Sequence, residues 1–463
     1  MEEKLNQREK SIIVFSILAC FWVVYYVWCF PGNMVWDSGT SIAWYLNLDR
    51  SNNNLPYFQN WLMGSFYSFG KLFGEPIIGI GLYCLIQMAL EMILLTKIML
   101  YLTREEIAGR AGYLPLILYC LMPLFPIYAM CMAKDANFGL AILLFEYYAI
   151  QYANEKRAFL ENRGKTAGMA AAVILCALFR NLGGIIPAAV FVIITLAKGK
   201  KQARIISVAT MAAVLMVYYA IPPLLGIPPG DRRENMSMPL QTTAYYIHQV
   251  PEEVTEEEKR IIDSVVGYEE MMELYNPHIA DPIKDISDFD AEKQKNFLKM
   301  WAGMIAKHPK VMLDGFIQST YVYYTPDAVN EARKPHASYS IAISDEHKDK
   351  LGLRFDQTAK EHAQDAVEAA MDLPVVGVFA KIGIYSWILA AITLLTIIFR
   401  RARKYFICCV PLLMVFIGCL LSPVNGYYRY AYSMILSIPV VLVPVITETV
   451  RGFREKSGRA HGK

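Results

Sequence analysis

Long apolar blocks are the sequence feature that most constrains how this chain can fold. A helix needs about 20 mainly apolar residues to cross the ~30 Å hydrocarbon core of a bilayer. We therefore predict an all-α, polytopic membrane protein with about ten transmembrane helices. The predicted spans are Ser11–Phe30, Ile77–Leu102, Tyr113–Met132, Ala136–Tyr152, Thr166–Phe179, Gly184–Ala197, Ile205–Leu225, Val375–Phe399, Tyr405–Leu421 and Tyr430–Ile446.

Composition supports this class and excludes a nucleic-acid-binding protein. Hydrophobic residues make up 55% of the 463 residues, charged residues only 19%, and the net charge is +3. Residues 226–373 hold 27 acidic and 16 basic residues, a net charge of −11, so the rest of the chain carries +14. An acidic middle region between basic flanks is typical of a water-exposed domain set between membrane segments.

Basic loops predict the orientation of the chain in the membrane. The segment Leu55–Gly74 mixes aromatic and polar residues, as interfacial helices do. If it lies flat at the interface, both termini and every strongly basic loop face the cytoplasm, which obeys the positive-inside rule throughout. If it spans, the basic loops at 156–165 and 198–204 face outward instead. We therefore predict interfacial helices in the first outer loop.

Three regions follow from this topology. Residues 1–225 form an N-terminal transmembrane module with a first outer loop at 31–76, residues 226–373 a mostly helical extracytoplasmic domain, and residues 374–463 C-terminal transmembrane helices and a basic tail. The apolar block at 167–197 should break at 179–184. One continuous helix would exceed the bilayer core and bury Arg180 in it.

Asp37, in the stretch GNMVWDSGTS, stands where the chain leaves its first predicted span. Asp37 or Ser38 suits the N-cap of an amphipathic helix over Ser38–Leu48. A carboxylate at the outer interface can also take a proton from a hydroxyl nucleophile. The two roles are compatible only if one carboxylate oxygen stays free.

Further charged residues lie at outward-facing ends of predicted spans. Lys134 and Asp135 suit an exposed capping ion pair, while Arg180 and Arg429 suit snorkelling to lipid headgroups. Alternatively, these cations converge and hold a lipid-linked phosphate. The stretch YNPHIADPIKD is rich in turn-forming residues and should form a structural turn. Within it, Asp281 and Lys284 are candidate functional residues only because of the residues around them.

Carboxylates inside predicted spans have two interpretations. Glu91 and Glu146 can form interhelical hydrogen bonds, which we favour, or serve a proton-coupled transporter. Six of the seven histidines fall in 226–373, and none shows metal-ligand spacing, so we predict no metal site.

Several motifs carry a resemblance that spans nearly the whole chain. They are PGNMVWDS, NNLPYFQNWLMG, MAKDANF, LFRNLGG, LQTTAYYI, YNPHIADPIK and SPVNGYYRY. With these the chain resembles the GT-C superfamily of polyprenyl-phosphate-dependent membrane glycosyltransferases, in particular the bacterial DUF6020 group. Protein O-mannosyltransferases and aminoarabinose transferases look similar in layout. Leu55-Pro56 departs from the His-Pro usual in the family.

The resemblance implies a function in the cell envelope. The donor would be a sugar on a polyprenyl phosphate, the acceptor a glycan or lipid-linked group, and the location the cell membrane, with multiple passes through the lipid bilayer. Asp37 would be the catalytic base, Lys134 and Asp135 would line the cleft, and Arg180 and Arg429 would hold the donor phosphate. A transporter or flippase of lipid-linked oligosaccharide, or a polysaccharide polymerase or ligase, remains the alternative.

Overall fold

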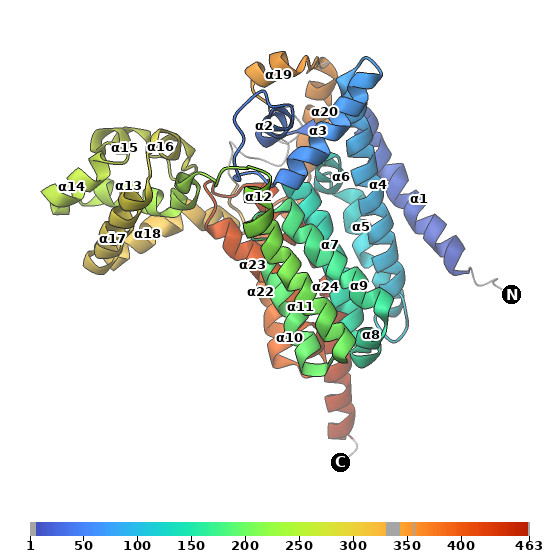
Figure 1. Ribbon diagram of the computed structural model, residues 1–463. Helices are drawn as coiled ribbons and strands as arrows, with labels where there is room; N and C mark the ends of the chain where they lie inside the picture. The colour runs from blue at the N-terminus through green and yellow to red at the C-terminus, as the bar shows by residue number, and fades with distance from the viewer. Residues whose placement is uncertain (1–5, 330–342, 355–356, 462–463) are drawn as a thin grey trace.

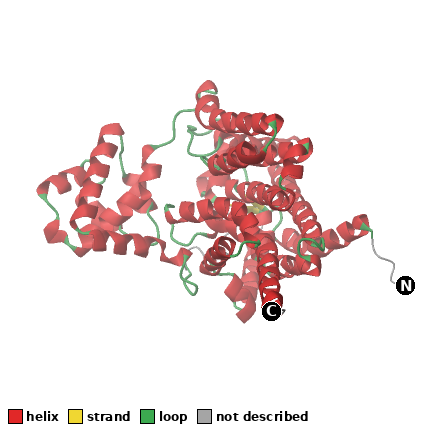
Figure 2. Cartoon of the chain, turned by 90° about the horizontal axis from the view of Figure 1, so that it is seen from below, coloured by secondary structure: helices red, strands yellow, loops and turns green. Residues whose placement is uncertain are grey.

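The computed structural model describes residues 6–329, 343–354 and 357–461, and it confirms the all-α prediction. Helices make up nearly all of its regular structure (Figure 2). In the described part of the chain, the strands are β1 (Asn33–Met34) and β2 (Cys131–Met132), which pair in parallel.

Five described helical segments are long and apolar enough to cross a membrane, which supports the predicted membrane class. They are α1 (Gln7–Trp28), α4 (Pro76–Leu102), the segment Lys201–Leu224 formed by α11 (Lys201–Leu215) through α12 (Ile221–Leu224), the segment Ala402–Leu420 that includes α23 (Phe406–Leu420), and the Tyr428–Glu455 part of α24 (Tyr428–His461). Two shorter apolar helices are α10 (Ile185–Lys198) and α22 (Ile382–Ile398).

Two predicted spans are not continuous helices. The block Tyr113–Met132 divides into α5 (Leu114–Leu121), α6 (Leu124–Ala129) and β2, because Met122 adopts the extended backbone that the following Pro123 imposes. The block Val375–Phe399 divides into α21 (Pro374–Phe379) and α22. The predicted break in the block at 167–197 is confirmed, since α9 (Arg163–Phe179) ends where expected and α10 begins at Ile185.

The centre of the bundle is formed by α7 (Lys134–Glu155) and α24. In α24, 78% of the apolar window is buried within the protein, against 17% in α1, which slants away from the bundle (Figure 1). Glu91 of α4 accepts a 2.7 Å hydrogen bond from the Tyr432 hydroxyl of α24, which confirms the predicted interhelical bond at this position. Glu146 of α7, fully buried, lies beside Cys408 of α23.

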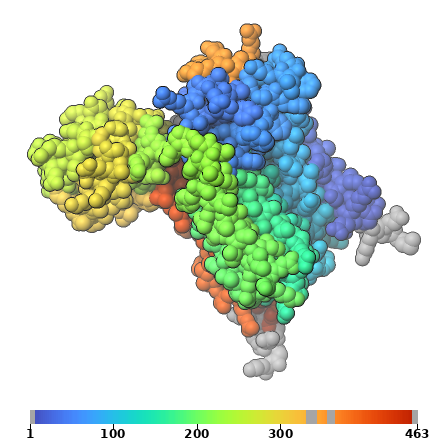
Figure 3. Space-filling view, viewed as in Figure 1, coloured from blue at the N-terminus to red at the C-terminus, as the bar shows by residue number. Residues whose placement is uncertain are grey.

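Helices between the bundle segments form two groups. A lobe with its own hydrophobic core, centred on Leu240, Phe297 and Met304, projects sideways from the bundle (Figures 1 and 3). Its helices are α13 (Ser237–Gln249), α14 (Glu256–Asp263), α15 (Tyr268–Leu274), α16 (Asp281–Ile286), α17 (Ala291–Lys307) and α18 (Pro309–Thr320).

The second group packs on the segment between α1 and α4. α19 (Asp345–Leu351) packs on α2 (Trp36–Tyr45), and α20 (Gln357–Met371) leads back to the bundle. The Tyr67 hydroxyl of α3 (Tyr57–Leu72) donates a 2.7 Å hydrogen bond to the Leu351 carbonyl. The range 226–373 therefore contributes both a lateral lobe and a cover over α2 and α3.

Candidate functional site

The short β1–β2 pairing aligns the starts of two helices. Its register joins Asn33 to Cys131 and Met34 to Met132, and each strand leads directly into α2 or α7. The Ser38 hydroxyl of α2 donates a 2.5 Å hydrogen bond to the Met132 carbonyl. Asp37 and Lys134, in the first turns of these helices, therefore face each other, with Oδ2 and Nζ 3.1 Å apart.

Buried amide side chains hold this non-helical backbone in place. The Gln87 side chain of α4 donates 2.9 Å hydrogen bonds to the carbonyls of Ala129 and Cys131, and the Asn33 side chain donates to Ile127 at 3.3 Å. Backbone groups that leave a helix inside an apolar bundle need such partners, because no bulk water reaches them. The strands thus become a fixed support for Asp37.

The structure corrects the predicted N-cap of this segment. Helix α2 begins at Trp36, with Val35 as its N-cap, and ends at Tyr45, so the predicted helix Ser38–Leu48 starts and ends too late. The Ser38 hydroxyl accepts the Val35 N–H at 2.9 Å. Asp37 therefore lies inside the first turn, where the helix dipole favours a negative charge.

Five charged side chains form one connected ion-pair network. Arg429 joins both acids, with Nη2 3.1 Å from Asp37 Oδ2 and Nε 3.0 Å from Asp135 Oδ2. Arg180 Nη1 lies 3.0 Å from Asp135 Oδ1. Together with the Lys134–Asp37 pair, the order of contacts is Lys134, Asp37, Arg429, Asp135, Arg180.

The middle of this network is buried within the protein, and its two ends are partly exposed to solvent. Side-chain exposure is 7% for Arg429 and 2% for Asp135, against 21% for Lys134 and 26% for Arg180 at the two ends. Burial alone would raise the pKa of the Asp37 carboxyl, but the charges of Arg429 and Lys134 outweigh it and hold that pKa well below its usual range. Asp37 is therefore ionised at neutral pH.

All seven residues predicted from the sequence line one cavity of about 770 Å³. We call it the charged cavity. The seven are Asp37, Lys134, Asp135, Arg180, Asp281, Lys284 and Arg429.

The backbone just before Asp281 and Lys284 is hydrogen-bonded to the turn before Arg429. Ile279 and Val424 form an antiparallel bridge, and the Ala280 N–H donates to the Pro423 carbonyl at 2.7 Å. The motifs YNPHIADPIK and SPVNGYYRY therefore meet in space. This contact brings the lateral lobe against the N-terminal end of α24.

Lys284 is the central group of this part of the charged cavity. Its Nζ lies 2.8 Å from Asp281 Oδ1 and 3.1 Å from Glu234 Oε2, and its side chain is 8% exposed. Burial alone would lower the pKa of the Lys284 ammonium. The negative charges of Asp281 and Glu234 raise this pKa by more than burial lowers it, so the net shift is upward.

Sequence reasoning missed several residues of the charged cavity. Glu234 and Asp285 add acids to its wall, and the guanidinium of Arg429 lies 5.2 Å from the ring centres of both Tyr427 and Tyr430. In the sequence, the pattern YYRY, which places both tyrosines close to Arg429, could have identified them as residues of the charged cavity. Leu55 and Pro56 also line the charged cavity, so an apolar side chain stands where the resemblance expects histidine.

Metal-binding groups are not gathered at this site. Within the described ranges, no cluster of three or more His, Cys, Asp or Glu side chains is arranged to hold a metal ion.

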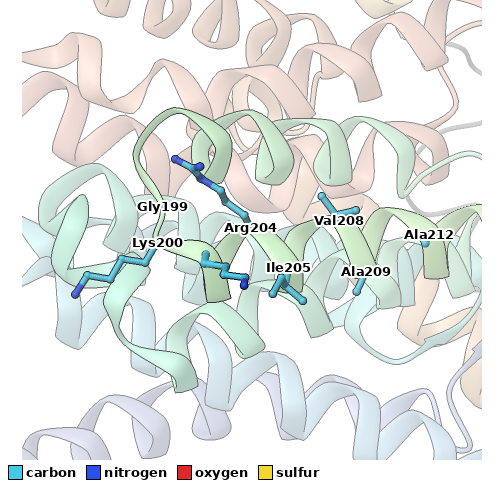
Figure 4. Close-up of a pocket in the computed structure, with 8 residues that line it drawn as sticks. Gly199, Lys200, Arg204, Ile205, Val208, Ala209 and Ala212 are labelled. Atoms are coloured by element: carbon cyan, nitrogen blue, oxygen red, sulfur yellow. The ribbon is translucent and has the colours of Figure 1, made fainter.

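A larger hollow of about 870 Å³ lies at the start of α11 (Figure 4). Lys200 and Arg204 stand at one end of it, and Ile205 and Val208 continue along the helix. Lys201 also lines it. The described residues that line it include no acid. Cations beside an apolar stripe suit anionic lipid headgroups. With no group to accept a proton, the hollow is a weaker candidate for a catalytic site than the charged cavity.

Comparisons with known proteins give a family match. A family model described as a family of unknown function (DUF6020) matches residues 42–459. No curated protein and no solved structure matches the chain. Six of the seven predicted site residues lie inside the matched range, and Asp37 lies five residues before it.

Proposed function

This chain belongs to the DUF6020 family, and we propose that it is an integral membrane glycosyltransferase of the GT-C type. It moves a sugar from a polyprenyl-phosphate donor to an extracytoplasmic glycan or lipid-linked acceptor. The observation that supports this most is the charged cavity, where the ionised Asp37 belongs to an ion-pair network with three cations, Lys134, Arg180 and Arg429.

In this proposal the chain crosses the cell membrane about ten times, with both termini in the cytoplasm and the charged cavity outside. Basic residues support that orientation. The turn before α11, with Lys200 and Lys201, lies at the opposite end of the bundle from α2 (Figure 1). Basic loops prefer the cytoplasmic side, and α2 and α3 then lie at the outer interface.

The cations suit the leaving group of this reaction. As the bond between the anomeric carbon and the phosphate oxygen breaks, the phosphate takes the electron pair and its negative charge grows. Arg429 and Arg180 offer several N–H donors in fixed positions, which is the arrangement that stabilises such a charge. No nucleotide-sugar is needed.

Asp37 takes the proton of the acceptor hydroxyl while the hydroxyl oxygen bonds to the anomeric carbon. Lys134 and Arg429 both lie closest to Oδ2, so we assign proton acceptance to Oδ1. In the unliganded protein these cations make Asp37 a weak base. A donor phosphate that also pairs with Lys134 and Arg429 partly neutralises their charge. The pKa of the Asp37 carboxyl then rises, and Asp37 becomes a stronger base. Donor binding thus activates the base.

The decisive experiment compares Asp37→Asn with Asp49→Asn in nanodiscs. Asp49 also lies in the first outer loop, is 28% exposed, and pairs with Lys350 outside the charged cavity. Transfer of radiolabelled sugar from a panel of polyprenyl-phosphate sugars should be lost in Asp37→Asn and retained in Asp49→Asn. Full transfer by a folded Asp37→Asn protein rules out the proposed base.

The transporter or flippase alternative has less support from the contacts. A proton-coupled carrier would use Glu91 in a water-filled path, but Glu91 is fully buried and bonded to Tyr432. A polymerase or ligase would share the lipid carrier and depend on Arg180 and Arg429 more than on Asp37.

A further inference from the structure

A third hollow, of about 530 Å³, lies beside the charged cavity. We call it the amide groove. Five aromatic side chains line it: Trp44, Tyr45, Tyr57, Phe58 and Trp61. Trp44 also lines the charged cavity, so the two hollows are neighbours.

The two hollows differ sharply in charge. None of the described residues that line the amide groove is charged, whereas ten charged side chains line the charged cavity. The polar groups of the amide groove are instead neutral, from Asn47, Ser51, Asn52 and Asn60. A ligand of the amide groove therefore gains nothing from carrying a charge.

Asn60 is the residue that points to a ligand. The residue is 8% exposed, and its Oδ1 has no hydrogen-bond partner among the described residues. A buried amide oxygen without a donor is unfavourable, and native structures normally supply one. A hydrocarbon chain in the amide groove would leave this oxygen unsatisfied, but a hydroxyl group would satisfy it.

Aromatic faces with neutral amides between them match a sugar chain. The apolar ring faces can pack on the C–H faces of sugar rings, while the amides exchange hydrogen bonds with hydroxyls. We propose that the amide groove binds a neutral, polyhydroxylated acceptor glycan, with Asn60 Oδ1 accepting a hydrogen bond from a sugar hydroxyl. This inference rests on the proposed function, because the glycan supplies the hydroxyl that reaches Asp37.

The position of Trp44 links the two hollows along one helix. Asp37 and Trp44 are seven residues apart on α2, which is two turns and about 10 Å. Residues at this spacing share a helix face. A glycan in the amide groove can therefore pass Trp44 and place its terminal residue near Asp37.

Tryptophan fluorescence of the full chain in nanodiscs tests the amide groove without requiring transfer. The probes are the neutral tetrasaccharides cellotetraose, maltotetraose and chitotetraose, with tetragalacturonate as the charged comparison. We expect saturable binding of at least one neutral probe, weakened at least tenfold in Asn60→Leu and in Trp61→Ala. Trp387→Ala is the matched control, since Trp387 is 59% exposed, Trp61 is 56% exposed, and Trp387 does not line the groove.

Three outcomes overturn the inference: no neutral probe binds, both groove variants bind as the unmodified protein does, or farnesyl phosphate displaces the bound neutral probe. Tighter binding of tetragalacturonate contradicts it equally. Failure of the proposed function is distinguishable, because Asp37→Asn should retain probe binding. If Asp37→Asn also retains transfer, the proposed base falls while the amide groove stands.

Discussion

Arg429 Nη2 and Asp37 Oδ2 lie 3.1 Å apart, although the two residues come from opposite ends of the chain. The same guanidinium reaches Asp135 Oδ2 at 3.0 Å through Nε. This one buried cation therefore contacts both acids of the ion-pair network, and it holds the N-terminal end of α24 against the starts of α2 and α7.

Replacement of Arg429 should destabilise the fold strongly. Arg429→Ala leaves the nearly fully buried Asp135 with less compensation, and loss of one partner from a buried ion pair costs about 3–5 kcal/mol. We expect a clear fall in Tm of the nanodisc-embedded protein. Arg157→Ala is the control, because the Arg157 side chain is 77% exposed and its pair with Glu161 contributes little. Equal Tm values for the two variants would contradict this role.

Asp37 should stabilise the fold in a pH-dependent way. Its folded-state pKa is depressed below the unfolded value of about 3.9, so its stabilisation is present above pH ~4 and is lost as pH falls toward the folded pKa. The Tm difference between the unmodified protein and Asp37→Asn should stay constant from pH 5 to 8 and shrink at lower pH. A difference that instead grows on acidification would show that the sign of the pKa shift is wrong.

Ser38→Ala should impair transfer by misplacing Asp37. The Ser38 hydroxyl bonds both the Val35 N–H and the Met132 carbonyl, and such bonds contribute about 1 kcal/mol each. We expect a modest loss of Tm and a larger proportional loss of transfer rate. Ser264→Ala removes a local helix bond in the lateral lobe and serves as the control. If the transfer rate falls no further in Ser38→Ala than in the control, the Ser38 hydrogen bonds do not position Asp37.

Glu91→Gln distinguishes a transferase from a proton-coupled carrier. Glutamine keeps an oxygen that can accept the Tyr432 hydrogen bond but removes the titratable carboxyl. A transferase should retain most of its rate, measured as sugar transfer in proteoliposomes. Complete loss of transport of a lipid-linked oligosaccharide across the proteoliposome membrane in this variant, with an unchanged Tm, would favour the carrier.

The sequence alone was sufficient for the helical membrane class and for naming seven charged residues that the structure brings to one cavity. Apolar blocks long enough to cross a bilayer have few other uses. Charged groups are costly in hydrocarbon, so those beside the blocks, such as Asp37, Arg180 and Arg429, were expected at the ends of spans. The break before α10 followed from the same argument about length and charge.

Only the tertiary structure decided which of these charges meet. Two-residue strands carry no periodicity, so the β1–β2 pairing that sets Asp37 against Lys134 is invisible in the sequence. The bridge between Ile279 and Val424, which brings Lys284 into the charged cavity, is equally non-local. Local composition fixes where a charge can lie relative to a membrane, but ion pairs between distant segments depend on how the helices pack.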